Sequence, residues 1–253
     1  MRKYARLAVA IVLALAATAA IALFSVYRAA RSVPEFYQRA LSAKPEEQKE
    51  AGQKFEQQAL ELHNQARRAG RWEARFTEDQ INGWLAAELP VKFPKLLPGG
   101  VADPRVAIDK SAVQLALRYD KGGTQTVVTL SGQVQLTAEP NELAVRIDAV
   151  RAGLLPLPFA RFRDEIAERA TKAGYPLHWT EVDGTPVALL RLPLDERQFK
   201  GRRLIVEELA LNSGELVVAG RTEMPSEKTE PPVEATGEPV RAAAPPKPDI
   251  EQR

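Results

Sequence analysis

The chain has 253 residues, 45% of them hydrophobic and 27% charged, and its 35 basic and 33 acidic residues leave a net charge of +2. This balance is ordinary for a globular protein and excludes the strongly basic surface by which many proteins bind nucleic acid. The absence of cysteine excludes disulfides and thiolate chemistry, and two histidines are too few for a histidine-built metal centre. We therefore expect no nucleic-acid partner, no metal and no cofactor.

The N-terminal segment, residues 7–27, is the uncharged run LAVAIVLALAATAAIALFSVY. A helix of this length is about 31 Å long, close to the thickness of the hydrocarbon core of a bilayer. The triplet Ala17-Thr18-Ala19 resembles a signal-peptide cleavage site, but apolar residues continue beyond it, so we favour an uncleaved transmembrane helix over a removed leader. The basic tail, residues 1–6, indicates a cytoplasmic N-terminus. The sequence thus predicts a single-pass protein of the inner (cytoplasmic) membrane with an extracytoplasmic domain.

Residues 28–71 are polar and predicted to be helical. Pro45 suits a first helical position, and Gly70 suits the end of a helix. A narrow apolar stripe with helical spacing fits either a solvated stalk or a helix that packs on the domain or a partner. We expect the stalk. The stripe consists of Phe55, Ala59, Leu62 and Ala66.

The domain is predicted to span residues 72–223. After a short strand that includes Trp72, residues 77–80, TEDQ, form a capping box in front of a helix that Pro90 ends. Strands of alternating polarity follow as far as residue 149, with turns at residues 120–123 and 139–142.

Residues 124–137 predict an unusually long strand of about 45 Å. Such a strand must twist strongly or wrap around another element. Gly132, in its middle and on its apolar face, indicates either a bend or the close approach of that element, which we assign to the next helix.

The junction into that helix is residues 153–162, GLLPLPFARF, which combine large apolar residues with two prolines. We expect the helix to begin at Pro158, to present an apolar face and to end at Gly174. Two hairpins follow, with turns at residues 183–184 and 212–214, and a change in the phase of alternation predicts a β-bulge in the second. The proline-rich tail, residues 224–253, is predicted to be disordered.

The order of these elements resembles that of the membrane-anchored members of the tubular lipid-binding (TULIP-like) superfamily of bacterial envelopes. The motifs that carry the resemblance are TEDQINGWL, the long amphipathic strands, GLLPLP and the closing SGELVVAG hairpin. The resemblance implies an α+β fold in which a long curved antiparallel sheet wraps around an amphipathic helix, behind a transmembrane helix and a helical stalk. It also implies an apolar groove that binds or shuttles a lipid-like ligand.

The sequence contains none of the common hydrolase, metalloprotease or nucleotide-binding motifs, so we expect no enzymatic activity. The alternative to lipid binding is a structural or assembly module of the envelope, with a filled core and a protein partner on its stalk or tail. In the lipid-binding hypothesis the groove is lined by apolar residues on the two predicted helices and their junctions. These residues are Trp84, Leu85, Phe93, Leu97, Leu154, Leu155, Leu157, Phe159, Phe162 and Ile166.

Overall fold

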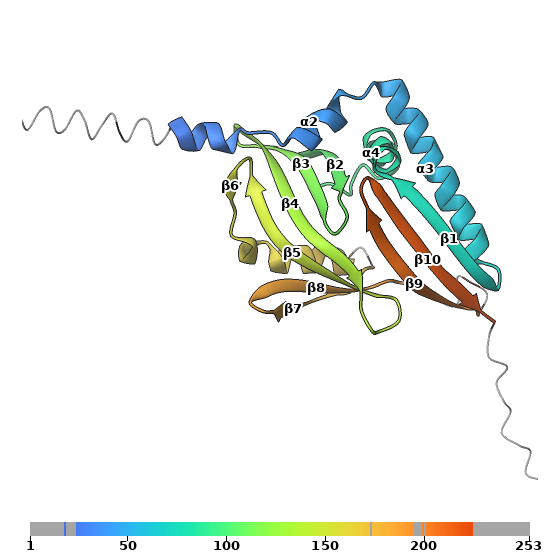
Figure 1. Cartoon of the computed structure of the whole chain (residues 1–253). Helices are drawn as coiled ribbons and strands as arrows, with labels where there is room; N and C mark the ends of the chain where they lie inside the picture. The colour runs from blue at the N-terminus through green and yellow to red at the C-terminus, as the bar shows by residue number, and fades with distance from the viewer. Residues whose placement is uncertain (1–17, 19–23, 173, 195–198, 200, 225–253) are drawn as a thin grey trace, which may run out of the picture.

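The computed structural model describes residue 18 and residues 24–172, 174–194, 199 and 201–224. The fold is α+β with a large antiparallel sheet, as predicted (Figure 1). Most of the predicted transmembrane segment, residues 7–17 and 19–23, and the predicted tail after Met224 lie outside the described residues. Within the described part of the chain, no helix has both the length and the apolar character that a bilayer crossing requires.

The helices follow the predicted order with shifted boundaries. They are α2 (Glu35–Ser42), α3 (Pro45–Ala66), α4 (Glu78–Ala87), α5 (Leu89–Lys92), the 3-10 helix η1 (Phe159–Arg161) and α6 (Arg163–Lys172). Pro45 opens α3 as expected, and Thr77 and Gln80 form the predicted capping box in front of α4. Three expected boundaries are wrong: Gly70 begins a strand rather than ending a helix, and Pro90 lies in the first turn of α5. The helix expected to begin at Pro158 begins only at Arg163, because Pro158 precedes the separate 3-10 helix η1.

Two antiparallel sheets make up the strand layer. The small sheet has the order β1-β10-β9, and the large sheet has the order β2-β3-β4-β5-β8-β7 with β6 paired to β5. The strands are β1 (Gly70–Thr77), β2 (Val101–Ile108), β3 (Val113–Lys121), β4 (Thr124–Leu136), β5 (Glu142–Ala152), β6 (Leu155–Pro156), β7 (Leu177–Val182), β8 (Thr185–Arg191), β9 (Arg203–Asn212) and β10 (Glu215–Glu223).

The long strand and both late hairpins are confirmed. β4 has 13 residues, and the hairpin turns lie at residues 183–184 and 213–214. The predicted bulge lies in β9, where Ala219 pairs with Glu208 but Gly220 pairs with Val206, so Glu207 is the extra residue.

Of the two interpretations of Gly132, the close approach of the next helix is wrong, and the irregularity of the strand is confirmed. A Cβ atom at this position would lie 2.3 Å from the carbonyl oxygen of Arg146, which belongs to the neighbouring strand β5. The register of β4 and β5 shifts at Gly132, so this glycine accommodates a bulge in the sheet and not the approach of a helix.

The preferred interpretation of residues 28–71 as a solvated stalk is also wrong for α3. This helix packs along α4 and β1, where Gly52 and Ala66 are buried and Phe55 stacks on Phe76 at 5.1 Å between ring centroids (Figure 1). The narrow apolar stripe is sufficient to pack α3 on α4 because Gly52 and Gly83 let the two helix backbones approach closely. The domain therefore begins before Trp72 and includes α2 and α3.

The expected wrapping of the sheet around the next helix is not observed either. No residue of α6 is buried, and its main contacts are with β7 and η1. The polar residues of α6 outnumber its apolar ones, so the helix can bury only a narrow strip, and that strip lies over one edge of the large sheet.

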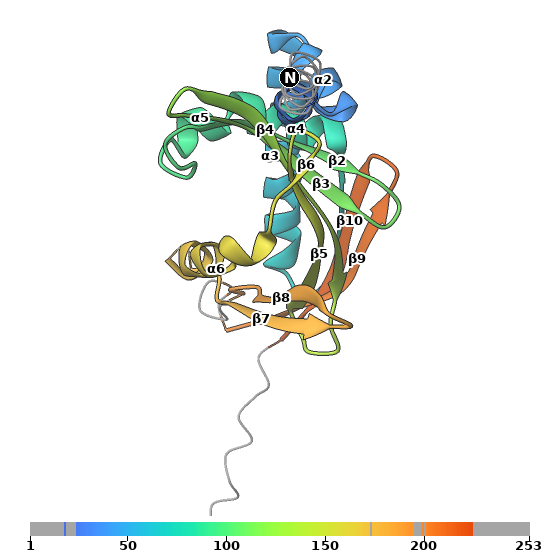
Figure 2. The ribbon, with the colours of Figure 1, turned by 90° about the vertical axis from the view of Figure 1, so that its left-hand side faces the viewer.

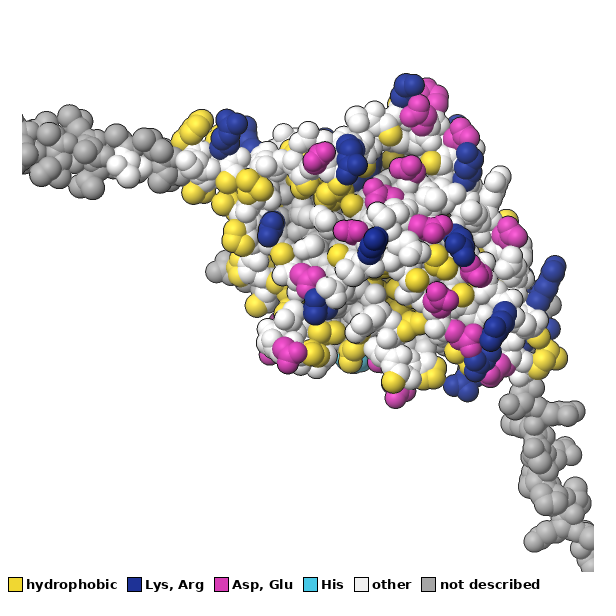
Figure 3. All heavy atoms as spheres, in the orientation of Figure 1, with side chains coloured by type: hydrophobic (Ala, Val, Ile, Leu, Met, Phe, Trp, Pro, Cys, Tyr) yellow, Lys and Arg dark blue, Asp and Glu magenta, His cyan; other side chains and the backbone are white. Residues whose placement is uncertain are grey.

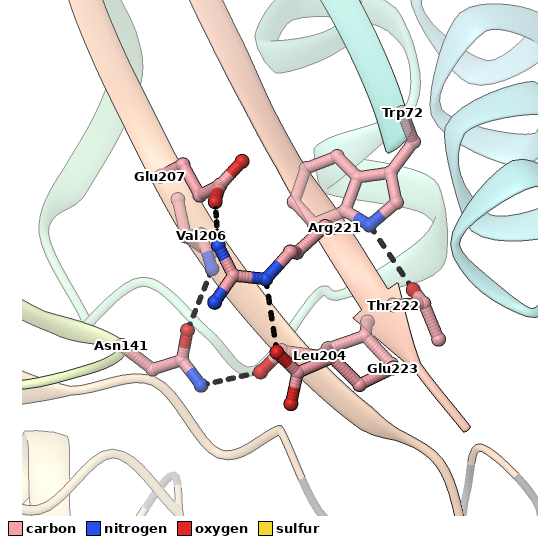
Figure 4. Close-up of polar contacts among 8 residues, drawn as sticks. All are labelled: Trp72, Asn141, Leu204, Val206, Glu207, Arg221, Thr222 and Glu223. Carbon is pink, nitrogen blue, oxygen red and sulfur yellow. Dashed lines mark hydrogen bonds and ion pairs between the residues drawn. The ribbon is translucent and has the colours of Figure 1, made fainter. Parts of the chain in front are cut away.

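The two sheets are joined by hydrogen bonds from the turn between β4 and β5. The side chain of Asn141 donates to the carbonyl of Leu204 at 2.7 Å and accepts from the amide of Val206 at 2.8 Å (Figure 4). Nearby, the Trp72 indole donates to the hydroxyl of Thr222 at 3.1 Å, within a core cluster of the small sheet. Asn141 thus forms hydrogen bonds with backbone groups at the edge of β9, as a neighbouring strand would.

We expect Asn141→Ala to lower the free energy of unfolding by about 2–3 kcal/mol. The substitution leaves two partly buried backbone groups without partners and places alanine at a φ of 59°, which favours asparagine or glycine. Asn141→Gly is the matched control, because glycine tolerates this φ and loses only the hydrogen bonds, so it should cost about 1 kcal/mol less than alanine. Urea unfolding measures both, and a neutral Asn141→Gly variant would show that the sheets are held together elsewhere.

Candidate apolar site

The large sheet has one continuous apolar face. Its cross-strand register aligns Leu115 with Leu130 and Val150 in one row, and Leu117 with Val128 in the next. Since successive side chains of a strand point to opposite faces, these residues share a face of β3, β4 and β5. Further along the same face lie Val134, Leu136, Leu143 and Val145.

The two faces of this sheet are covered unequally. On the opposite face, Tyr37 of α2 packs on Ala116 and Val127, and all three residues are buried. On the apolar face, Leu115, Leu117, Val128 and Leu130 are only half-buried. Four large aliphatic side chains in the middle of a sheet therefore stay in partial contact with solvent.

Helices border the apolar face at its two edges. At the edge formed by β2, α4 packs against the strand, and Asn82 exchanges hydrogen bonds with both backbone groups of Val106. At the edge formed by β7, Trp179 lies across from Ala188 and Val145, and its indole donates to the carbonyl of Arg163 at 3.0 Å.

Between these edges, no helix in the described residues packs extensively on β3, β4 or β5. Figure 2 shows α5 and α6 on the same side of the large sheet and well separated from each other. The candidate site is thus a strip of sheet between two helical borders, which we call the apolar strip. It consists of the half-buried Leu115, Leu117, Val128 and Leu130 and the buried Val150 beside them.

The border at α4 and α5 contains four of the ten residues predicted from the sequence. Trp84 stacks between Phe55 and Phe93, at 5.7 and 5.9 Å between ring centroids, and its indole donates to Glu56 at 3.0 Å. Leu85, Phe93 and Leu97 line a pocket of about 420 Å³ between this border and the start of β2. The hydrogen bond from Lys92 holds the pKa of Glu56 below its ordinary value, so the carboxylate stays charged beside the tryptophan.

The border at α6 contains the second group of predicted residues. The chain reverses at Gly153, and β6 folds back on β5, so that Leu155 pairs with Ala152. Pro156 needs no ladder donor because β6 is an edge strand. Phe159 then contacts Trp179 at 5.2 Å between ring centroids, and Phe162 remains exposed. The remaining members of this group, Leu157 and Ile166, are half-buried.

Leu154 lies apart from both groups. It is exposed at the tip of the β5–β6 turn, where it lines a surface hollow together with Phe24 and Tyr27. The structure therefore places the ten predicted residues at two borders and one tip, and no pocket found in the described residues contains both border groups.

The apolar strip itself was absent from the predicted site. Its signal is present in the sequence as the alternation of β3, β4 and β5, but the predicted lining of the groove included only residues of the two helices and their junctions. Because α6 packs only at the β7 edge, the four strip residues of β3 and β4 are left half-exposed.

The asparagine at the α4 border and the polar pair on the covered face have structural roles. Asn82 binds the backbone of Val106 in β2, 24 residues away in the chain. On the covered face, burial raises the pKa of Tyr37 and lowers that of Arg105, whose guanidinium donates to the carbonyl of Pro104. No group of three metal-ligating side chains occurs among the residues that the structure describes.

No family model, curated protein or solved structure matches the chain. The class of site is therefore defined by its geometry: a half-exposed aliphatic strip on a long curved sheet, bordered by aromatic side chains.

Proposed function

We propose that this is a single-pass membrane protein of the cell envelope whose domain binds the acyl chain of a lipid along the apolar strip. The observation that carries the proposal is the half-exposure of Leu115, Leu117, Val128 and Leu130 in the centre of the sheet. The anchor is the uncharged run at residues 7–27, and the extracytoplasmic orientation follows from the basic tail in front of it.

The dimensions of the strands that carry the strip support an elongated ligand. Three neighbouring strands span about 10 Å, and a strand of 13 residues is about 43 Å long. One leaflet of a bilayer core is about 15 Å thick, which is the reach of a single acyl chain. An acyl chain therefore fits along the strands and covers several of the aliphatic side chains at once.

The energetics support an apolar ligand over a polar one. Covering a half-exposed leucine or valine removes apolar surface from water, which is favourable by about 25 cal/mol per Å². The described side chains of the strip carry no charge that would bind a polar substrate. The aromatic rings at the borders, Trp84 and Phe93 on one side and Phe159 and Trp179 on the other, add further apolar surface.

We expect a photoactivatable phospholipid, with its reactive group in the acyl chain, to label β4 when the full chain is reconstituted in vesicles. Trypsin cleaves after Lys121 and Arg146, so the adduct appears on one peptide that contains the whole of β4. Leu130→Asp should lower the yield of this adduct about tenfold, because a carboxylate replaces apolar contact in the middle of the strip.

The matched control is Gln133→Asp, which adds the same charge to β4 on its opposite face, across from Arg146. It should leave the adduct unchanged. Equal yields in Leu130→Asp and the unsubstituted chain would contradict lipid binding on the strip and favour a structural module whose sheet is covered by another protein.

A further inference from the structure

The end of the domain next to the N-terminal segment is held rigidly to it. The amide of Leu154 donates to the carbonyl of Ala29 at 2.8 Å, and the Thr126 hydroxyl donates to the carbonyl of Ala30. Gly153 is required at this contact, since a Cβ atom there would lie 2.2 Å from the Ala29 oxygen and its φ is 57°. The β5–β6 turn and the start of β4 therefore move together with residues 29–30.

This contact fixes the distance between Leu154 and the uncharged run. Residues 24–30 are helical, and Ala29 follows Tyr27, the last uncharged residue of the run, by two positions. Two helical residues rise about 3 Å, which is less than one turn. Wherever the run at residues 7–27 ends in a bilayer, Leu154 lies at the same depth within a few ångströms.

The composition of this end fits the interface of a membrane. Phe24, Tyr27 and Leu154 are exposed together, and Leu154 is 62% exposed although its side chain is entirely apolar. Arg28 and Arg31 line the same hollow of about 620 Å³, and the Arg31 guanidinium lies 4.5 Å from the centre of the Tyr27 ring. Figure 3 shows hydrophobic and basic side chains side by side where the N-terminal segment meets the body. Tyrosine and arginine are typical of the interfacial zone, where apolar bodies are buried and cationic heads meet lipid phosphates.

We propose that Phe24, Tyr27, Leu154, Arg28 and Arg31 form a docking surface that seats the domain directly on a bilayer containing anionic phospholipid. The domain is thereby held against the membrane at its β5–β6 turn and is not suspended on a flexible linker. This inference rests on the membrane anchor of the proposed function and is independent of the ligand on the apolar strip.

The test uses the full chain in vesicles of phosphatidylcholine and phosphatidylglycerol. The chain has no cysteine, so Leu154→Cys carries a single environment-sensitive fluorophore. Leu60→Cys is the matched control, because Leu60 is 61% exposed on α3, whose middle lies away from the N-terminal helix (Figure 1). A lipid with a nitroxide near its headgroup should quench the label at residue 154 at least twofold more than the label at residue 60.

Each other outcome is informative. Equal quenching at both positions would overturn the docking surface, while flotation of the protein with the vesicles reports separately on the anchor. A blue-shifted label at residue 154 that nitroxide lipid does not quench would show that a protein or a second copy covers Leu154, which would also overturn the proposal. Quenching that is unchanged in pure phosphatidylcholine would show that anionic lipid is not needed, and would contradict the proposed role of Arg28 and Arg31.

Discussion

We expect Gly220→Ala to lower the free energy of unfolding by about 3 kcal/mol or more, although the substitution adds only one methyl group. A Cβ atom at position 220 would lie 2.2 Å from the Ile205 carbonyl oxygen and 2.5 Å from the ring of Trp72. Neither atom can move easily, because the carbonyl belongs to the bulged strand β9 and the ring is buried and hydrogen-bonded to Thr222.

The matched control is Gly99→Ala, where no atom lies within 4 Å of the added methyl group. It should change the free energy of unfolding by no more than about 0.5 kcal/mol. Urea unfolding followed by tryptophan fluorescence measures both variants. A Gly220→Ala variant as stable as the Gly99→Ala variant would mean that the bulge of β9 and the Trp72 ring are not packed as the structure has them.

The Gly220 contact illustrates which parts of the fold follow from local sequence. The bulge in β9 was predicted because the alternation of apolar residues changes phase between Val206 and Leu209, and phase is a local property. The ring that fills the space over Gly220 belongs to Trp72, which is 148 residues away in the chain, and alternation does not identify such a partner. The same limit applies to Asn141, whose side chain completes the edge of a strand in the other sheet.

The candidate site shows a similar division. Nine of the ten residues predicted from the sequence lie at the two borders, in or near TEDQINGWL and GLLPLPFARF, but Trp179 was not among the predicted residues. The sequence did not indicate that α6 would pack at the β7 edge, because the apolar side of that helix is compatible with either an edge or a central position. Where a helix rests on a sheet decides which strand residues are core and which are exposed, and this is settled by long-range packing.

The burial of α3 leads to the second large effect, for Gly83→Ala. In a solvated helix, alanine is more stable than glycine by about 1 kcal/mol, so a free stalk beside α4 predicts that the substitution stabilises the protein. In the structure, a Cβ atom on Gly83 would lie 2.4 Å from the Gln48 carbonyl oxygen and 2.7 Å from the Gly52 amide nitrogen, both in α3. We therefore expect the opposite sign.

Gly83→Ala should lower the free energy of unfolding by about 1–3 kcal/mol, because the added methyl group forces the backbones of α3 and α4 apart. The loss should be local at first, since α3 also contacts β1 near Ala66. Hydrogen exchange should show faster exchange in α3 around Gln48 and Gly52, with little change in the large sheet. A Gly83→Ala variant that is more stable, with unchanged exchange in α3, would contradict the packing of α3 on α4 and support the solvated stalk that the sequence alone favoured.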